Sequence, residues 1–173
     1  PWSIGGGGAA ELREHIEQVA AKTLGALVQA TGVMLVTGED DVFIRGRASD
    51  FDRLAAPIAS RKVLVEGDAV RDWGFQSECD AMYEYDRVGR HSPTAELDRY
   101  FWGFRALMKP AIYFGRTKEQ RGMHWREYGV IVKDKLGDTP TITFGEVATH
   151  NHFVLDRGGK IFKQTAPVIK LPA

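Results

Sequence analysis

The chain has 173 residues, of which 43% are hydrophobic and 27% charged, and it carries no net charge at pH 7. This length and composition can bury one sizeable core, so a single folded domain is expected. No apolar run is long enough to span a bilayer, and no basic and apolar leader opens the chain, which predicts a cytoplasmic protein without a membrane partner. Cys79 is the only cysteine, which excludes an internal disulfide and a multi-cysteine zinc site.

The charges are divided unevenly along the chain. Residues 1–98 carry 10 Lys/Arg and 17 Asp/Glu, a net −7, whereas residues 99–173 carry 13 and 6, a net +7. Such an excess of cations in the second half is typical of a face that binds a polyanion. The alternative is that the two halves neutralise each other across an internal interface.

The N-terminal region predicts a linker followed by a helix. Four glycines lie within residues 1–8 and carry a high entropic cost when ordered, so this segment is expected to link the remaining domain, 9–173, to something before it. Apolar residues then recur at intervals of three and four, which predicts a helix that Gly32 ends. They are Leu12, Ile16, Val19, Leu24, Leu27 and Val28.

Short strands and one short helix are expected next. Apolar runs at 33–36 and 42–45 flank an acidic segment, 37–41, and predict a hairpin whose tip is either a solvated turn or, less in keeping with its spacing, a cation site. A short helix over 50–56 and a strand over 62–66 follow, and the acidic stretch 78–86 is expected to be an exposed loop or edge.

Ser92 and Pro93 open a second predicted helix, with Ser as the N-cap and Pro at the first helical position. Leu97, Phe101 and Phe104 fall on one face of it, and Pro110 ends it. Aromatic residues at this spacing are more often part of a core than stacked on bases.

The most basic region follows that helix. Its cations and interleaved aromatic residues are Arg116, Lys118, Arg121, His124, Arg126, Lys133 and Lys135, with Trp125 and Tyr128. A solvated helix of alternating charge is one interpretation. Because only three acidic residues accompany these seven basic ones, contact with phosphates is expected instead.

Residues 139–173 carry the clearest strand pattern. β-Branched, aromatic and aliphatic residues form short runs separated by turn residues, and the Gly158-Gly159 pair after Asp156 and Arg157 suits a hairpin connection. The whole sequence therefore predicts one α+β domain, with helices packed on a mostly antiparallel twisted sheet that ends in a C-terminal β-meander.

A long motif in this region resembles the C-terminal specificity region of adenine-specific DNA methyltransferases of the BREX phage-exclusion PglX type, related to fused type II restriction–modification enzymes. The similarity is densest over 144–162 and 166–172. It extends upstream through residues 1–3, 65–73, 101–102 and 122–128, so nearly the whole chain is covered.

The resemblance implies a chain that recognises DNA within a larger enzyme. In this family a Gly-containing strand-to-helix turn holds S-adenosylmethionine, and an Asn/Asp-Pro-Pro-aromatic motif holds the extruded adenine. This chain has neither motif, so no catalytic residue, metal ligand or cofactor is expected in it. It is expected to bind double-stranded DNA and to present the target adenine to the methyltransferase domain of the same parent chain, alongside other defence-system proteins.

The chemistry of the side chains suggests which of them contact DNA. Asn151 and Gln164 can pair with adenine, Arg157 and Lys160 can pair with guanine, and His150 and His152 can donate to bases or phosphates. Cations that can anchor phosphates complete the predicted set, namely Arg116, Lys118, Arg121, Arg126 and Lys163. For each residue the alternative is that it satisfies a turn or a neighbouring strand.

Two other function classes remain open. His150-Asn151-His152 spells the name of a family of metal-dependent nucleases, but successive residues of an extended segment point to opposite faces, which disfavours a shared metal. A protein-interaction module, with the acidic half docked on a partner, is compatible with DNA recognition.

Overall fold

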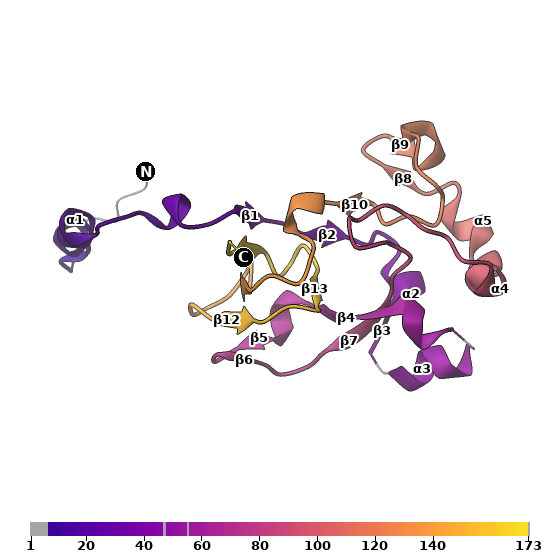
Figure 1. Cartoon of the computed structure of the whole chain (residues 1–173), viewed down its shortest axis with the longest axis horizontal. Helices are drawn as coiled ribbons and strands as arrows, with labels where there is room; N and C mark the ends of the chain where they lie inside the picture. Colours follow the sequence, from indigo (N-terminus) through magenta and orange to yellow (C-terminus); the bar gives the residue numbers. More distant parts are fainter. Residues whose placement is uncertain (1–6, 47, 55, 173) are drawn as a thin grey trace.

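Two four-stranded sheets organise the part of the chain that the computed structural model describes, residues 7–46, 48–54 and 56–172 (Figure 1). The C-terminal sheet is antiparallel, with the order β1 (Ala30–Gly32), β14 (Val168–Lys170), β11 (Thr141–Phe144) and β12 (Phe153–Asp156). The central sheet has the order β13 (Ile161–Phe162), β4 (Arg61–Val65), β7 (Cys79–Met82) and β3 (Ile44–Arg45). In this sheet β13 is parallel to β4, and the other pairs are antiparallel.

Three two-stranded pairs complete the sheet structure of these residues. They are β2 (Leu35–Val36) with β10 (Val130–Ile131), β5 (Val70–Arg71) with β6 (Gly74–Phe75), and β8 (Ile112–Tyr113) with β9 (Arg116–Thr117). The β5–β6 and β8–β9 pairs are hairpins, and each joins its strands through a loop of two residues.

The helices are short. The α-helices are α1 (Ala9–Val19), α2 (Asp40–Phe43), α3 (Ala48–Arg53), α4 (Asp98–Trp102) and α5 (Arg105–Met108). The 3₁₀ turns are η1 (Leu24–Ala26), η2 (Ile58–Ser60), η3 (Gly67–Ala69), η4 (Ala95–Leu97), η5 (Glu119–Arg121) and η6 (Lys133–Lys135). The α+β class predicted from the sequence is confirmed.

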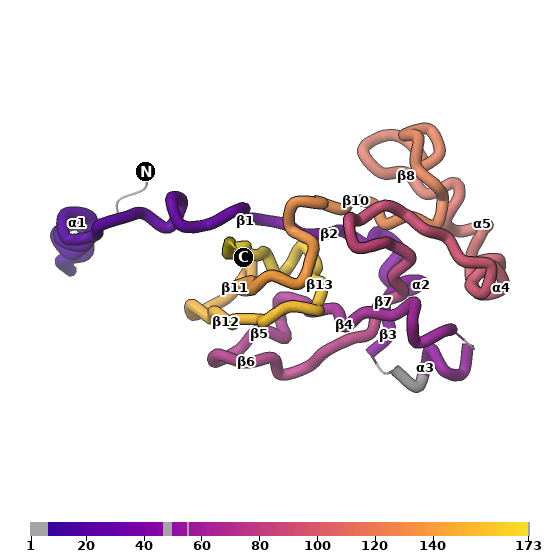
Figure 2. Tube along the Cα trace, in the orientation of Figure 1, coloured from indigo at the N-terminus to yellow at the C-terminus, as the bar shows by residue number. Residues whose placement is uncertain are grey.

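The N-terminal helix stands away from the body of the molecule, at the end of an extended arm (Figure 2). The predicted helix reaches Val28, but α1 ends at Val19 and the chain then leads into β1, so the second half of that prediction is wrong. No residue of α1 is buried, and Leu12, Ile16 and Val19 form an apolar stripe exposed to solvent. Of the predicted glycine linker, residues 1–6 lie outside the described residues.

Strand pairing differs from the prediction in two other places. Residues 33–45 do not form a hairpin, because β2 pairs with β10, β3 pairs with β7, and the acidic segment between them is helical in α2. The stretch 78–86 is not an exposed edge, because β7 lies between β4 and β3. The predicted helix from Ser92 is divided into η4, α4 and α5, and it buries Leu97 and Phe101 as expected.

The C-terminal strands depart from a simple meander at one strand. β12 pairs with β11 and β14 returns to the other side of β11, but β13 leaves this sheet and pairs with β4. The segment 156–159 therefore connects two sheets and is not a hairpin turn. Both of its glycines have positive φ, as the sequence indicated.

An aromatic core joins the central sheet to the segments around it. Phe43 lies 5.8 Å from Phe101 and 4.8 Å from Tyr128, measured between ring centroids. The Tyr128 hydroxyl donates to the Met82 carbonyl, and the Tyr100 hydroxyl donates to the Val42 carbonyl, so both of these buried hydroxyls are paired.

Buried ion pairs connect the acidic first half of the chain to the basic second half. Lys118 Nζ lies 2.9 Å from Glu39 Oε2, and only 1% of the lysine is exposed. Lys163 Nζ lies 2.7 Å from Asp40 and 2.6 Å from Glu66.

Arg126 makes the third such connection. It is 4% exposed and donates to both carboxylate oxygens of Glu84 and, at 2.6 Å, to Asp98. Its guanidinium also lies over the Phe101 ring. Burial alone would raise the pKa of Glu84, but the neighbouring His91 imidazole, the Arg126 guanidinium and the Thr94 amide together lower it below its usual range.

We expect Lys118→Met to lower the free energy of unfolding by about 3–5 kcal/mol, because it leaves the buried Glu39 carboxylate without its cation. Arg116→Met, two residues away on an exposed side chain, is the matched control and should change it by less than about 0.5 kcal/mol. Urea unfolding followed by circular dichroism measures both. Equal small effects would show that Lys118 is not a structural cation.

Glu84→Gln should weaken the fold at neutral pH and flatten the acid side of its stability profile. The folded pKa of Glu84 lies below the unfolded value, so the ionised group stabilises the fold above its unfolded pKa, and this contribution is lost as the pH falls through the folded pKa. Urea midpoints measured from about pH 7 to pH 3 test this. Glu146→Gln, at an exposed loop position, should leave the pH dependence unchanged.

Candidate nucleic-acid interface

The connection between β11 and β12 carries three of the predicted DNA-contacting residues. His150 and Asn151 are exposed and His152 is half-buried. We call residues 145–152 the recognition loop. Beside it lies a cavity of about 370 Å³ that these three residues line together with Phe144 and Phe153.

The β5–β6 turn supports this loop. The Asp72 amide donates to His152 Nδ1 at 3.2 Å, and the Asp72 carboxylate lies 3.4 Å from the same nitrogen. This turn consists of Asp72 and Trp73, both with positive φ, and the Trp73 side chain is 82% exposed. Trp73 is not among the residues predicted to contact DNA, although its position at a hairpin tip could have marked it.

The segment after β12 holds Arg157 and Lys160 in different environments. Arg157 is exposed, whereas Lys160 is half-buried and lies 3.2 Å from Asp156 and 3.7 Å from Glu78. The Gly158 amide donates to Asp156 Oδ2, so the aspartate fixes this turn. Arg157 is thus free of the pairing that holds Lys160.

β12 separates these residues into two groups. His150, Asn151 and His152 precede the strand, and Arg157 and Lys160 follow it. Along β12 itself, Phe153 and Leu155 face outward while Val154 and Asp156 are buried.

Three of the predicted phosphate anchors are buried in the ion pairs that stabilise the fold. Lys118, Arg126 and Lys163 contact carboxylates of the first half of the chain, and this corrects their assignment as DNA contacts. For Lys163, burial lowers the pKa, but hydrogen bonds to Asp40 and Glu66 outweigh it and hold the pKa above its usual value. Gln164 is half-buried, and its Oε1 is enclosed without a hydrogen-bond partner in the described part of the chain.

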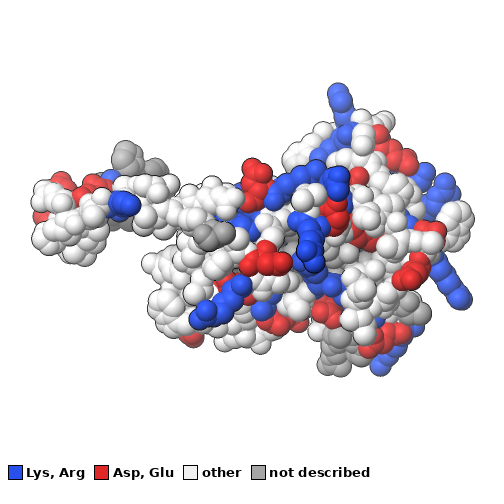
Figure 3. Space-filling model, in the orientation of Figure 1, with Lys and Arg blue, Asp and Glu red and all other residues white. Residues whose placement is uncertain are grey.

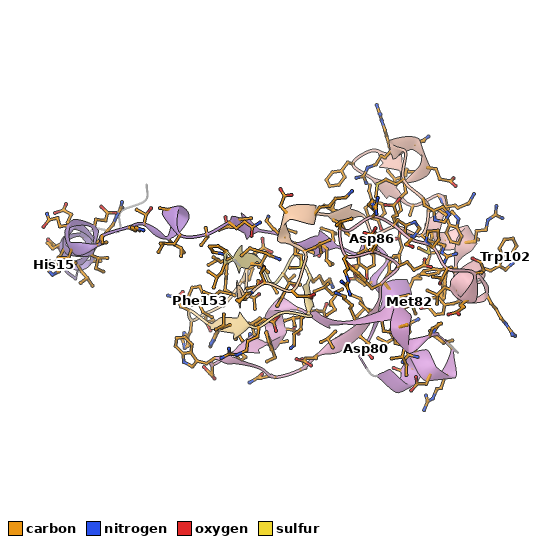
Figure 4. The ribbon with its side chains drawn as sticks, viewed as in Figure 1. His15, Asp80, Met82, Asp86, Trp102 and Phe153 are labelled. Carbon is orange, nitrogen blue, oxygen red and sulfur yellow. The ribbon has the colours of Figure 1, made fainter. Side chains whose placement is uncertain are left out.

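The β8–β9 hairpin presents the remaining two anchors. Arg116 is exposed on β9, and Arg121 is half-buried in the following turn, where its guanidinium donates to the Gly129 carbonyl at 3.3 Å. Phe114 occupies the tip of this hairpin and is 82% exposed. The hairpin and the recognition loop lie toward opposite ends of the body, at the ends marked by Trp102 and Phe153 respectively (Figure 4).

Further cations lie between these two ends. In Figure 3 Lys and Arg side chains gather around η6 and across the middle of the visible face, with acidic side chains interspersed. Arg90 and Lys133 line a cavity of about 330 Å³ there, together with Tyr85, His91 and Tyr128. Arg90 is paired with Asp86 at 2.8 Å, whereas Arg87 and Lys133 are exposed.

The two histidines of the nuclease interpretation lie close together. Their ring centroids are 6.1 Å apart, and His150 Nδ1 lies 2.6 Å from the Thr149 carbonyl oxygen. Among the residues that the structure describes, no group of three or more His, Cys, Asp or Glu side chains could hold a metal ion. None of the helices in these residues is long and apolar enough to cross a bilayer.

Comparison with known proteins finds relatives in sequence and in structure. No protein-family model matches the chain. The adenine-specific methyltransferase PglX of Streptomyces coelicolor is 35% identical over 178 aligned residues, which cover 99% of this chain and 14% of that protein. The structure of the Type IIL restriction–modification enzyme MmeI in complex with DNA has a TM-score of 0.58 at 9% identity, over 89% of this chain and 20% of that one.

The match to MmeI shows that the fold is shared with part of that enzyme. The match to PglX shows that the predicted resemblance extends over almost all of this chain, which spans about one seventh of the methyltransferase's length. The chain is therefore similar to one segment of an adenine-specific methyltransferase.

Proposed function

We propose that this chain is the target-recognition domain of an adenine-specific (N6) DNA methyltransferase that serves a phage-defence or restriction–modification system. The observation that carries the proposal is the similarity of 99% of the chain to a segment of PglX. The fold it shares with a restriction–modification enzyme studied in complex with DNA supports it.

Recognition, rather than methyl transfer, is the activity that these residues can supply. The chain has no Asn/Asp-Pro-Pro-aromatic motif to hold an adenine, because none of its prolines is followed by a second one. S-adenosylmethionine and the catalytic residues are therefore assigned to another part of the larger enzyme, and this chain alone should bind DNA without modifying it.

Sequence readout is assigned to the recognition loop. Asn151 is exposed there and carries the paired donor and acceptor that match the N6 and N7 edge of adenine. Arg157, exposed beyond β12, can address guanine O6 and N7. Phosphate contacts are assigned to Arg116 and Arg121 on one side and to the exposed Lys133 between the two ends.

Contact with the methyltransferase domain is assigned to α1. Its apolar stripe of Leu12, Ile16 and Val19 is exposed, and no residue of α1 is buried in the part of the chain that the structure describes. An amphipathic helix gains most of its stability from burying such a stripe, so the rest of the enzyme is the proposed surface for it. This stripe is also the observation that favours a protein-interaction module as the second candidate function.

The affinity for duplex DNA should fall steeply with salt. If about four phosphates are neutralised, the slope of log K against log salt is about −3.6, which predicts a loss of roughly 100-fold between 50 and 200 mM salt. Fluorescence anisotropy with a labelled random-sequence duplex measures this. A flat response, or no binding at 50 mM, would favour the interaction module.

Asn151→Ala and Arg116→Ala should affect binding in different ways. Asn151→Ala should relax the preference for one base in duplexes selected from a random pool, by about 5- to 150-fold, because it removes a paired contact to a base edge. Arg116→Ala should weaken all sequences equally and reduce the salt slope by about one.

Selection and sequencing of bound duplexes, together with salt titrations, distinguish the two effects. An unchanged base preference in the Asn151 variant would remove this residue from the readout without affecting the proposal for Arg116.

A further inference from the structure

The β8–β9 hairpin has an unfavourable residue at its tip. Tyr113 pairs with Arg116, which leaves Phe114 and Gly115 as a loop of two residues with φ of 53° and 77°. Two consecutive positive φ values are the requirement of a type I′ turn, where Asn-Gly is the favoured pair. A bulky aromatic residue in this left-handed conformation is a rare outlier, and such outliers persist mainly where function needs them.

Packing within the chain does not explain the choice of phenylalanine. The side chain is 82% exposed, so almost none of its apolar surface is removed from water. Arg121 lies against the ring, with its guanidinium carbon 5.3 Å from the ring centroid. Because Arg121 is held by the Gly129 carbonyl, it braces one face of the ring and leaves the rest open.

The base of the hairpin, by contrast, is rigid. The Tyr113 hydroxyl donates to Glu39 Oε1 at 2.6 Å, and the buried Lys118 binds the other oxygen of the same carboxylate. The Tyr113 ring packs so closely on Gly38 that a Cβ there would lie 2.4 Å from the hydroxyl oxygen. The tip is therefore an exposed aromatic group on a fixed support, which lowers the entropic cost of binding.

The charge around the ring selects the partner. Arg116 follows the tip directly and is exposed, and Glu119, the nearest acid along the chain, is paired with Lys109 at 3.0 Å. An aromatic face beside positively charged side chains complements stacked bases between phosphates. Trp73, at the tip of the β5–β6 hairpin, is equally exposed, but it follows Asp72, whose acidic side chain is 84% exposed. An acidic neighbour of this kind does not complement phosphates.

We propose that Phe114 is a base-stacking wedge: its ring inserts between neighbouring base pairs of bound duplex DNA while Arg116 holds the adjoining phosphate. Insertion unstacks and kinks the base-pair step, which is how apolar wedges act in other DNA-binding proteins. The inference rests on the proposed function. It adds a contact that depends on how easily a base-pair step unstacks, and not on hydrogen bonds to the base edges.

The test is Phe114→Asn in the 173-residue chain. This variant creates the favoured Asn-Gly turn, so its melting temperature should be equal to or higher than that of the original chain, while its affinity for duplex DNA should fall by about tenfold or more. Duplexes containing 2-aminopurine should become more fluorescent on binding the original chain, because the probe unstacks, and should stay quenched with the variant.

Two further variants make the result specific. Phe114→Trp keeps a stacking ring and should retain both the affinity and the fluorescence change. Ile58→Asn alters a side chain of similar exposure, 79%, on η2, away from the hairpin, and should leave both unchanged.

The outcomes separate the wedge from the proposed function. If the original chain binds DNA with the expected salt dependence but Phe114→Asn binds equally well, or if 2-aminopurine stays quenched throughout, the wedge is wrong and the proposed function stands. If the original chain does not bind DNA at low salt, both are overturned. Loss of binding in Phe114→Trp as well would also contradict a stacking contact.

Discussion

The fold depends on ion pairs that it buries between its two halves. Lys118, Lys163 and Arg126 each come from the basic half and each meets a carboxylate of the acidic half. A charge removed from water is stable only with a partner and hydrogen bonds, so each pair fixes the relative position of segments that are far apart in sequence. Glu39 illustrates this, because its two oxygens hold both Lys118 and Tyr113 and so set where the β8–β9 hairpin begins.

The same pairs limit which cations are available for the proposed contact with DNA. The opposite net charges of the two halves are consistent with a polyanion-binding face and with internal neutralisation. In the structure, Lys118, Lys163 and Arg126 neutralise carboxylates of the acidic half. Exposed cations such as Arg116, Arg157 and Lys133 remain on the surface. In the proposed function, uncharged contacts from Asn151 in the recognition loop and from Phe114 at the hairpin tip add to those that the exposed cations make.

Local structure could be predicted from the sequence where a short segment determines it. The strands around residues 62–66 and 141–144, the short helix near 50 and the positive φ of Gly158 follow from side-chain type alone. The pairing partners of the strands could not be predicted, because β2 pairs with β10 and β13 pairs with β4, and about a hundred residues separate the strands of each pair. Nor could the burial of Lys118, since nothing local distinguishes it from the exposed Arg116 two residues before it.

Two aromatic residues depart from the residue preferences of tight turns, and both lie at hairpin tips. Phe114 and Trp73 each occupy a left-handed position that glycine or asparagine would fill at lower cost, and neither ring is buried in return. A local cost without a packing gain is typical of positions that act on something outside the chain. The Trp73 turn also supports the recognition loop, because the Asp72 amide donates to His152. The Phe114 tip is exposed to solvent. The neighbouring charge differs between the tips, with the Asp72 carboxylate next to Trp73 in sequence and the Arg121 guanidinium beside the Phe114 ring, and this difference favours a polyanion as the proposed partner of the second tip.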